Sequence, residues 1–266
     1  MSRIGLGIGS TQNFYNSGLA WTPADITTSA WYDASVTGSI TIATGASQWN
    51  DLNGTYHLTQ GTGANQPASG TRNINGLNAL DFDGSNDNLA NGTLSDNFEG
   101  TDVAFGMYMV FQNDLASQAD YIVCMESTSD ADPINALRVS GGDAYIGFRR
   151  DDANAVLQTA SGGTTSTNPA VMNFIFDGTT GSLYANGASL ASKNMQLSAV
   201  QTFNNFIVGQ RTPGNHFNGL IGELIITDGT ETTATRQNIE GYLAHKWSLV
   251  GSLDGGHPYK VNPPGR

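Results

Sequence analysis

The sequence is poor in charge and in cysteine. Charged residues make up 13% of its 266 residues, lysine occurs only at positions 193, 246 and 260, and the formal net charge is −12. Nucleic-acid binding takes most of its affinity from a basic face, so this balance argues against a nucleic-acid partner. The single cysteine, Cys124, excludes an intrachain disulfide, and its apolar neighbours predict a buried, inert thiol.

Long apolar segments are also missing. No run has the length of a membrane span, so no membrane partner is expected, and the N-terminus lacks the apolar core of a signal peptide. Residues 1–20 are rich in Gly, Ser and Asn without any sustained period, which predicts an extended arm that is ordered only against a neighbour. The Gly5-x-Gly7-x-Gly9 spacing has no strand before it and no helix after it, which disfavours a nucleotide-binding loop.

What the sequence has in abundance is turns. It holds 33 glycines, and Asn-Gly begins at 53, 75, 91, 186 and 218, while Asp-Gly begins at 83, 177, 228 and 254. Such dipeptides favour tight turns because Asn, Asp and Gly tolerate positive φ. Between them lie short β-branched and aromatic segments, which predict one antiparallel β-sandwich domain over residues 21–266. The predicted strands are Val103–Phe111, Tyr121–Met125, Ala136–Val139, Ala144–Arg149, Val171–Phe176, Ser182–Ala185 and Phe203–Val208.

A strand passes into a helix near the C-terminus. The apolar run Leu220–Ile226 predicts a buried strand, and Thr232 or Thr233 is a plausible N-cap for a short helix over about 232–250. The helix contains Gly241, at a cost of about 1 kcal/mol relative to Ala, so it needs packing to persist. We therefore expect its apolar stripe to lie on the sandwich, followed by a Pro-rich tail, Gly256–Pro264.

Several motifs resemble the concanavalin A-like, laminin-G-type jelly roll. Its closing strands are similar to Phe176-Asp-Gly178, Leu183-Tyr-Ala-Asn-Gly187 and Phe217-Asn-Gly219 with Ile221-Gly-Glu223. Further segments resemble a narrower subgroup of this family, which is encoded by tailed bacteriophages and aquatic bacteria. They are Trp21-Thr-Pro23, Ala30-Trp-Tyr-Asp-Ala34, Gln48-Trp-Asn-Asp51, Leu80-Asp-Phe-Asp-Gly-Ser-Asn-Asp87, Ile239-Glu-Gly-Tyr-Leu-Ala-His-Lys-Trp247 and His257-Pro-Tyr259. The resemblance implies a jelly-roll sandwich and specifies no ligand. Leu52-Asn-Gly-Thr55 replaces the Ser-Gly-Asn-Gly turn usual after Trp49.

Known catalytic patterns are not found. None of the five glutamates falls in the Glu-x-Asp-x-x-Glu pattern of related glycoside hydrolases; Glu126 with Asp130 comes nearest, and Glu223 reads as a structural residue. No Gly-x-Ser-x-Gly elbow is present, and the four histidines lack zinc spacing. The chain is therefore predicted not to be an enzyme, although an unfamiliar carboxylate pair stays an alternative.

Ligand sites are harder to predict. Asp83 and Asp87 are weak calcium candidates, because Asp81-x-Asp83-Gly-Ser85-x-Asp87 spaces oxygen ligands closely, but a structural turn is favoured and no other cofactor is expected. The four tryptophans are candidate sugar platforms, yet their places in fold motifs favour core packing. The glycan-binding residues are unknown; Phe98, Tyr108 and His216 are unranked rim candidates.

The resemblance implies a non-enzymatic structural protein of a tailed-phage virion. It would be a capsid decoration protein, head fibre or tail appendage, assembled in the host cytoplasm and displayed on the particle surface. We expect a homo-oligomer that contacts other virion proteins through residues 1–20 and that binds host or environmental glycans. The alternative is a bacterial carbohydrate-binding or carbohydrate-cleaving module that is not part of a particle.

Overall fold

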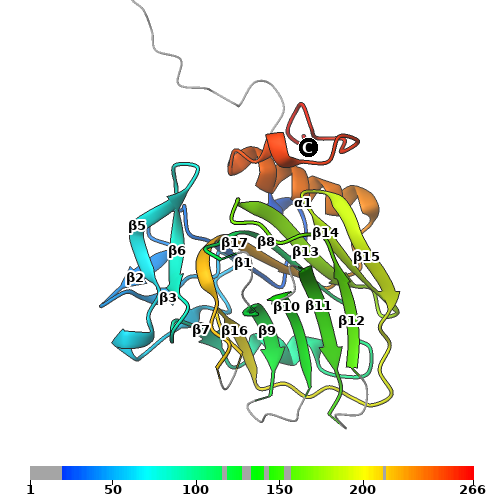
Figure 1. Ribbon diagram of the computed structural model, residues 1–266, viewed down its shortest axis with the longest axis horizontal. Helices are drawn as coiled ribbons and strands as arrows, with labels where there is room; N and C mark the ends of the chain where they lie inside the picture. The colour runs from blue at the N-terminus through cyan, green and yellow to red at the C-terminus, as the bar shows by residue number, and fades with distance from the viewer. Residues whose placement is uncertain (1–19, 116–118, 128–132, 141–143, 153–156, 212–213) are drawn as a thin grey trace, which may run out of the picture.

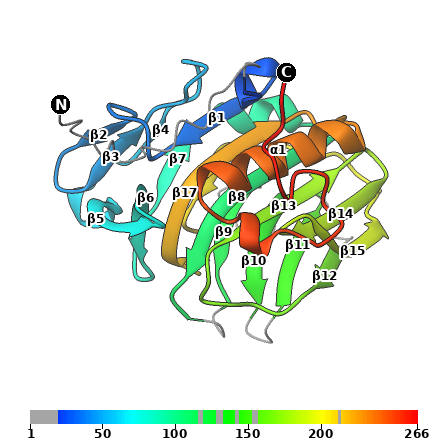
Figure 2. The same ribbon diagram turned by 90° about the horizontal axis from the view of Figure 1, so that it is seen from above.

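The computed structural model describes residues 20–115, 119–127, 133–140, 144–152, 157–211 and 214–266, so the predicted arm lies outside the described residues except for Ala20. The described chain forms two antiparallel sheets packed face to face, with an α-helix on the outside (Figures 1 and 2). The predicted all-β jelly-roll sandwich is confirmed. No helix of the described residues is long and apolar enough to cross a membrane.

The helix-bearing sheet has eight strands in the order β15-β14-β13-β8-β17-β6-β5, with β1 paired to β17. Its strands are β1 (Ala30–Asp33), β5 (Ala68–Ile74), β6 (Leu77–Asp83), β8 (Phe105–Asn113), β13 (Ala170–Phe176), β14 (Thr180–Ala185), β15 (Ala188–Asn194) and β17 (Asn218–Thr227).

The opposite sheet has nine strands in the order β12-β11-β10-β9-β16-β7-β4-β3-β2. They are β2 (Ile40–Ile42), β3 (Ala46–Trp49), β4 (Leu58–Thr59), β7 (Leu89–Asn91), β9 (Tyr121–Glu126), β10 (Ile134–Ser140), β11 (Ala144–Arg150), β12 (Leu157–Gly162) and β16 (Asn205–Val208). Short 3-10 turns are η1 (Pro23–Asp25), η2 (Gly63–Asn65), η3 (Leu94–Phe98) and η4 (Val250–Ser252).

The central strands are buried on both faces, which explains their continuous apolar runs. In β8, Phe105 and Met107 point into the core between the sheets, whereas Tyr108 and Val110 face the layer under the helix. Burial of each large apolar side chain contributes about 1.5–3 kcal/mol. The hydrophobic core therefore has two layers: one between the sheets and one between the eight-stranded sheet and the helix.

Helix α1 (Thr233–Lys246) closes that outer layer (Figure 2). The hydroxyl of Thr232 accepts a hydrogen bond from the Thr235 backbone N–H at 3.2 Å, as the predicted N-cap requires. Gly241 is explained by the C-terminal tail, because a Cβ there would lie 2.7 Å from Tyr259. The glycine that weakens the isolated helix thus allows the tail to pack closely against it.

The turn predictions succeed in part. Asn75-Gly76 and Asn186-Gly187 both adopt positive φ at the two positions, as tight hairpins require. The turn predicted at Asn218-Gly219 is wrong, because both residues lie inside β17, where Gly219 has φ +151° and passes close to the Gln112 carbonyl.

Candidate functional site

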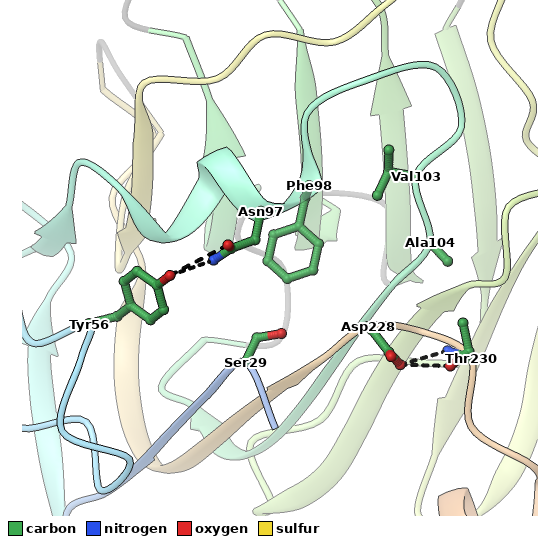
Figure 3. A pocket seen from close by; sticks show the side chains of 8 residues that line it. All are labelled: Ser29, Tyr56, Asn97, Phe98, Val103, Ala104, Asp228 and Thr230. Carbon is green, nitrogen blue, oxygen red and sulfur yellow. Dashed lines mark hydrogen bonds between the residues drawn. The ribbon is translucent and has the colours of Figure 1, made fainter. Parts of the chain in front are cut away.

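An open pocket lies where several strands of the sandwich begin or end, with a volume of about 470 Å³ (Figure 3). We call it the rim pocket. Its lining comes from four stretches of chain that are far apart in sequence: Ser29, Tyr56, the segment Asn97, Phe98, Val103 and Ala104, and the pair Asp228 and Thr230.

Tyr56 is positioned by a buried carboxylate beneath its loop. Asp51 is 3% exposed, and its Oδ2 accepts hydrogen bonds from the backbone N–H groups of Thr55 and Tyr56 at 3.1 and 3.0 Å. Its Oδ1 accepts from the N–H groups of Trp31 and Asn53 at 2.9 and 3.0 Å. The Leu52–Thr55 turn, where the sequence departs from the usual pattern, thus wraps around Asp51 and presents Tyr56 at the pocket.

The opposite wall is the short helix η3. It begins where the side chain of Asn91 accepts from the Leu94 N–H at 2.8 Å, and it carries Asn97 and Phe98. The Asn97 side-chain amide donates to the Tyr56 hydroxyl at 3.0 Å, which joins the two walls (Figure 3). Asn97 is exposed, whereas Phe98 is only 2% exposed and packs into the core between the sheets.

The third wall is formed by chain ends of the eight-stranded sheet. The Ser29 N–H donates to the Ile226 carbonyl at 2.7 Å, so the start of β1 is held against the end of β17. Asp228 follows β17 directly, and its Oδ1 accepts from the backbone N–H and the hydroxyl of Thr230 at 3.2 and 2.8 Å. Both Asp228 and Thr230 are exposed to solvent.

The pocket combines ring surfaces with hydrogen-bonding groups. The partly exposed Tyr56 ring offers an apolar face, and an amide, a carboxylate and two further side-chain hydroxyls line the same pocket (Figure 3). Amides and carboxylates bind neighbouring hydroxyl groups well, because they provide paired acceptors or an acceptor beside a donor. This chemistry suits a polyhydroxylated ligand that also has apolar C–H faces.

Of the three rim candidates from the sequence, Phe98 alone lines this pocket. Tyr108 is fully buried in the layer beneath α1, and His216 lies beside Asp83, where burial lowers its pKa. Sequence reasoning missed Tyr56, Asn97 and Asp228. The local signal was weak: Asp228 looked like any Asp-Gly turn, and nothing placed Tyr56 next to a segment forty residues away.

The calcium candidates hold a turn together. Asp83 Oδ1 accepts from the backbone N–H groups of Ser85 and Asn86 at 2.8 and 3.3 Å, and Asp87 Oδ2 accepts from the Asp83 N–H at 3.0 Å. Burial raises the pKa of Asp87 to about 6, with the nearby Asp83 and Asp81 contributing. Across the described residues, no three acidic, histidine or cysteine side chains form a metal-binding group. These hydrogen bonds are those of a turn, and the weak calcium assignment stays a prediction.

The carboxylates considered for catalysis lie elsewhere. Glu223 is fully buried under α1, where Oε2 accepts from Trp247 Nε1 and Lys246 Nζ at 2.7 Å each. This agrees with its predicted structural role. Glu126 is buried at the end of β9, and its suggested partner Asp130 lies outside the described residues. Asp228 is the one carboxylate among the residues that line the rim pocket.

The tryptophans pack as the sequence favours. Trp49 and Trp247 are fully buried and Trp21 is 6% exposed, while Trp31 is partly buried against the helix layer. Trp31 Nε1 also donates to Glu223 Oε1 at 2.8 Å. None of the four lines the rim pocket.

Neither the family models nor the curated proteins include a match to this chain. Solved structures do match. Trypanosoma rangeli sialidase in complex with sialic acid has a TM-score of 0.58 at 11% identity, covering 86% of this chain and 36% of that one. The same sialidase with 2,3-difluorosialic acid scores 0.56 at 12% identity, covering 82% and 32%.

The likeness is one of fold. At these identities the match shows a shared sandwich architecture, and the chain spans about a third of the length of the sialidases it matches. The CBM40 of the Ruminococcus gnavus IT-sialidase, bound to α2,3-sialyllactose, matches with a TM-score of 0.45 at 10% identity, covering 50% of this chain and 80% of that one.

Proposed function

We propose that this chain is a non-catalytic carbohydrate-binding β-sandwich that holds a glycan in the rim pocket. The observation that carries the proposal is the lining itself: the Tyr56 ring, the Asn97 amide and the Asp228 carboxylate converge on one open space of about 470 Å³. That volume suits one or two sugar rings. The sandwich shared with a sialidase that binds sialic acid supports the same class of ligand by analogy of fold alone.

The same lining supports the non-catalytic part of the proposal. Glycoside hydrolysis usually needs two carboxyl groups on either side of the bond, about 5–10 Å apart. The rim pocket contributes Asp228 alone among its lining residues. Binding therefore accounts for the pocket better than cleavage, and the carbohydrate-binding part of the alternative drawn from the sequence gains more support than the virion assignment.

A glycan array of the purified chain tests this function, followed by calorimetric titration of the sugars that bind. We expect Tyr56→Ala and Asp228→Asn each to weaken binding about tenfold, since each removes a contact worth about 1–1.5 kcal/mol. Leu52→Ala, in the same loop but outside the lining, is the control for Tyr56. Asp254→Asn, which alters another exposed turn carboxylate, is the control for Asp228.

Two results would contradict the proposal. Glycan binding that survives both pocket substitutions would place the site elsewhere, and an array without any bound sugar would remove the function. Release of a fluorescent aglycone from a panel of glycosides would contradict its non-catalytic part.

Attachment to a tailed-phage particle through residues 1–20 is a second proposal, which rests on the sequence resemblance. One structural observation favours it: the root of this segment is held firmly. Trp21 N–H donates to the Pro264 carbonyl at 3.1 Å, Ala20 pairs with Gly265, and Arg266 forms an ion pair with Asp25 at 2.6 Å. These contacts fix residues 20–25 to the C-terminal tail, as attachment through the preceding segment would require.

Particle attachment is tested by immunogold labelling of purified particles and by deletion of residues 1–19. We expect labelled heads or tails, and loss of label with a sandwich that still folds when the segment is deleted. Protein that stays free of particles would favour the bacterial alternative. The predicted homo-oligomer is checked by analytical ultracentrifugation of the full chain.

A further inference from the structure

Two arginines meet over one tyrosine on the outer face of the nine-stranded sheet. The guanidinium carbons of Arg138 and Arg211 lie 5.1 and 5.4 Å from the centre of the Tyr121 ring. Their Nη1 atoms both donate to the Tyr121 hydroxyl oxygen, at 3.2 and 3.5 Å. Because both bonds end on the same atom, the two guanidinium groups are held within about 7 Å of each other.

The backbone fixes this arrangement. Arg138 on β10 is the register partner of Tyr121 on β9, so their side chains stand side by side on one face. Arg211 follows β16, and its segment is pinned to β9 because the Gly209 N–H donates to the Ile122 carbonyl at 2.8 Å. The Cys124 thiol donates to the Gln210 carbonyl at 3.2 Å. The pairing of β9 with β10 and β16 therefore places Arg138 and Arg211 on either side of Tyr121.

Among the described residues, the two arginines share one carboxylate within ion-pair distance. Arg211 has one acidic neighbour, Glu126, whose Oε2 lies 4.0 Å from Nε. Among the described residues no carboxylate is within ion-pair distance of Arg138; Asp120 acts on it from farther away, and burial raises the pKa of that carboxyl to about 6. Two like charges repel at this separation, so an anion between them would be favourable. The two neighbouring arginines thus form a local basic group in a chain whose net charge is −12.

Aromatic rings border the two cations. Phe148 on β11 packs edge-on against Tyr121, with ring centres 6.4 Å apart and planes at 87°. Phe148 is partly exposed on the same outer face. A sugar acid presents both a planar carboxylate, which guanidinium groups bind in a bidentate manner, and C–H faces that pack on aromatic rings. A simple inorganic anion would use the arginines alone.

We propose that Arg138 and Arg211 form a second binding site, which takes the carboxylate of an acidic sugar while Phe148 packs against its ring. This site shares no residue with the rim pocket, so either site can fail without the other. Both arginines are partly exposed, and guanidinium groups bind a carboxylate through charge-assisted hydrogen bonds.

The test is an NMR titration that follows the arginine side-chain N–H signals of the full chain, which contains eight arginines. The probes are N-acetylneuraminate, its methyl ester, glucuronate, glucose and acetate. We expect the Arg138 and Arg211 signals to move with one or both sugar acids, and not with the ester or with glucose. Unmoved signals, or equal movement with the ester, would overturn the site. Equal movement with acetate would overturn its preference for sugars.

Substitutions separate binding from a structural role. Arg138→Gln and Arg211→Gln should each weaken binding of the sugar acid about tenfold or more, because a hydrogen bond to a charged group contributes about 1.5–3 kcal/mol. Arg138→Lys keeps the charge and loses the fork, so it should lie between them and the wild type. Lys193→Gln, which removes one positive charge from exposed β15, should change nothing. If the glutamine variants fold and bind normally, the arginines serve only to hold Tyr121.

Discussion

Two cations, one buried and one partly exposed, stabilise this sandwich in different ways. Arg149 is fully buried between the sheets, where its nitrogens donate to Asp102, Asn135, Gln201 and the Met195 carbonyl at 2.8–3.1 Å, and it stacks 3.5 Å from the Phe176 ring centre. Lys246 lies under the helix with its side chain 20% exposed and serves two buried carboxylates, those of Asp33 and Glu223. The first network has one acid for its cation, and the second has two.

The difference determines how each network responds to loss of its cation. Burial lowers the pKa of Arg149 to about 10, so it remains charged at neutral pH, and most of its partners are neutral groups that cannot change their charge. Burial raises the pKa of Glu223, so that carboxyl can take up a proton in place of Lys246. The Arg149 network therefore keeps its cation charged near neutral pH, whereas Glu223 in the network under the helix can change its protonation with pH.

Replacing each cation by methionine tests this contrast. We expect the larger loss of stability at Arg149. Arg149→Met removes the cation that pairs with Asp102 and the donors to Gln201 Oε1 and the Met195 carbonyl, so we expect a loss of about 3–5 kcal/mol in the free energy of unfolding. Urea denaturation at pH 7 measures it. Arg149→Lys keeps the charge and should lose less; a methionine variant within 1 kcal/mol of the wild type would contradict this account.

Lys246→Met should cost about 3 kcal/mol at pH 8 and clearly less at pH 5. A carboxyl whose folded pKa lies above its unfolded value carries no penalty below the unfolded pKa, and its full penalty develops as the pH rises through the folded pKa. Removal of Lys246 raises the pKa of Glu223 further, so the loss must grow with pH. Urea denaturation at both pH values checks this; adding Glu223→Gln should flatten the dependence, and an equal loss at both would refute it.

The network under the helix could be anticipated from the sequence better than the network around Arg149. Glu223 and Lys246 lie in the motif segments that resemble the jelly-roll family, and the helix start at Thr232 was readable from its cap. Arg149 has no such local signal: in β11 its side chain points inward and pairs with Asp102. Alternation along a strand sends adjacent residues to opposite faces, and sequence proximity cannot say which face is buried.

A third buried carboxylate, that of Asp51, forms no ion pair within the described part of the chain and accepts hydrogen bonds from backbone N–H groups instead. Asp51→Asn turns one acceptor oxygen into an amide that faces two N–H donors, so we expect a loss of about 2 kcal/mol in unfolding free energy. Because those donors belong to Thr55 and Tyr56, glycan affinity at the rim pocket should fall about tenfold as well. Denaturation and calorimetric titration measure the two effects, with Leu52→Ala as control. Unchanged affinity would show that the loop holds Tyr56 without Asp51.

The rim pocket was beyond reach of the sequence for a related reason. Each of its residues has an ordinary local explanation: Asp228 ends a strand, Asn97 lies in a turn, and Tyr56 follows an Asn-Gly pair. Their convergence depends on long-range pairing, in which Ser29 bonds to Ile226 and Asn97 bonds to Tyr56. Strands, turns and the helix follow local patterns, whereas a site built from loops requires the complete topology.

Asp87 completes the comparison, because its negative charge is partly buried among other acids. Its folded pKa of about 6 exceeds the usual 3.8, so the penalty is present above pH 6 and disappears below 3.8. Asp87→Asn keeps an oxygen for the Asp83 N–H, and we expect it to raise the free energy of unfolding at pH 8 by about 1 kcal/mol and to match the wild type at pH 4. Thermal unfolding with calcium or chelator should give the same Tm for the wild type if the turn reading holds. A calcium-dependent rise that the asparagine variant loses would instead make Asp83 and Asp87 ligands, and the raised pKa would then mark a cation site.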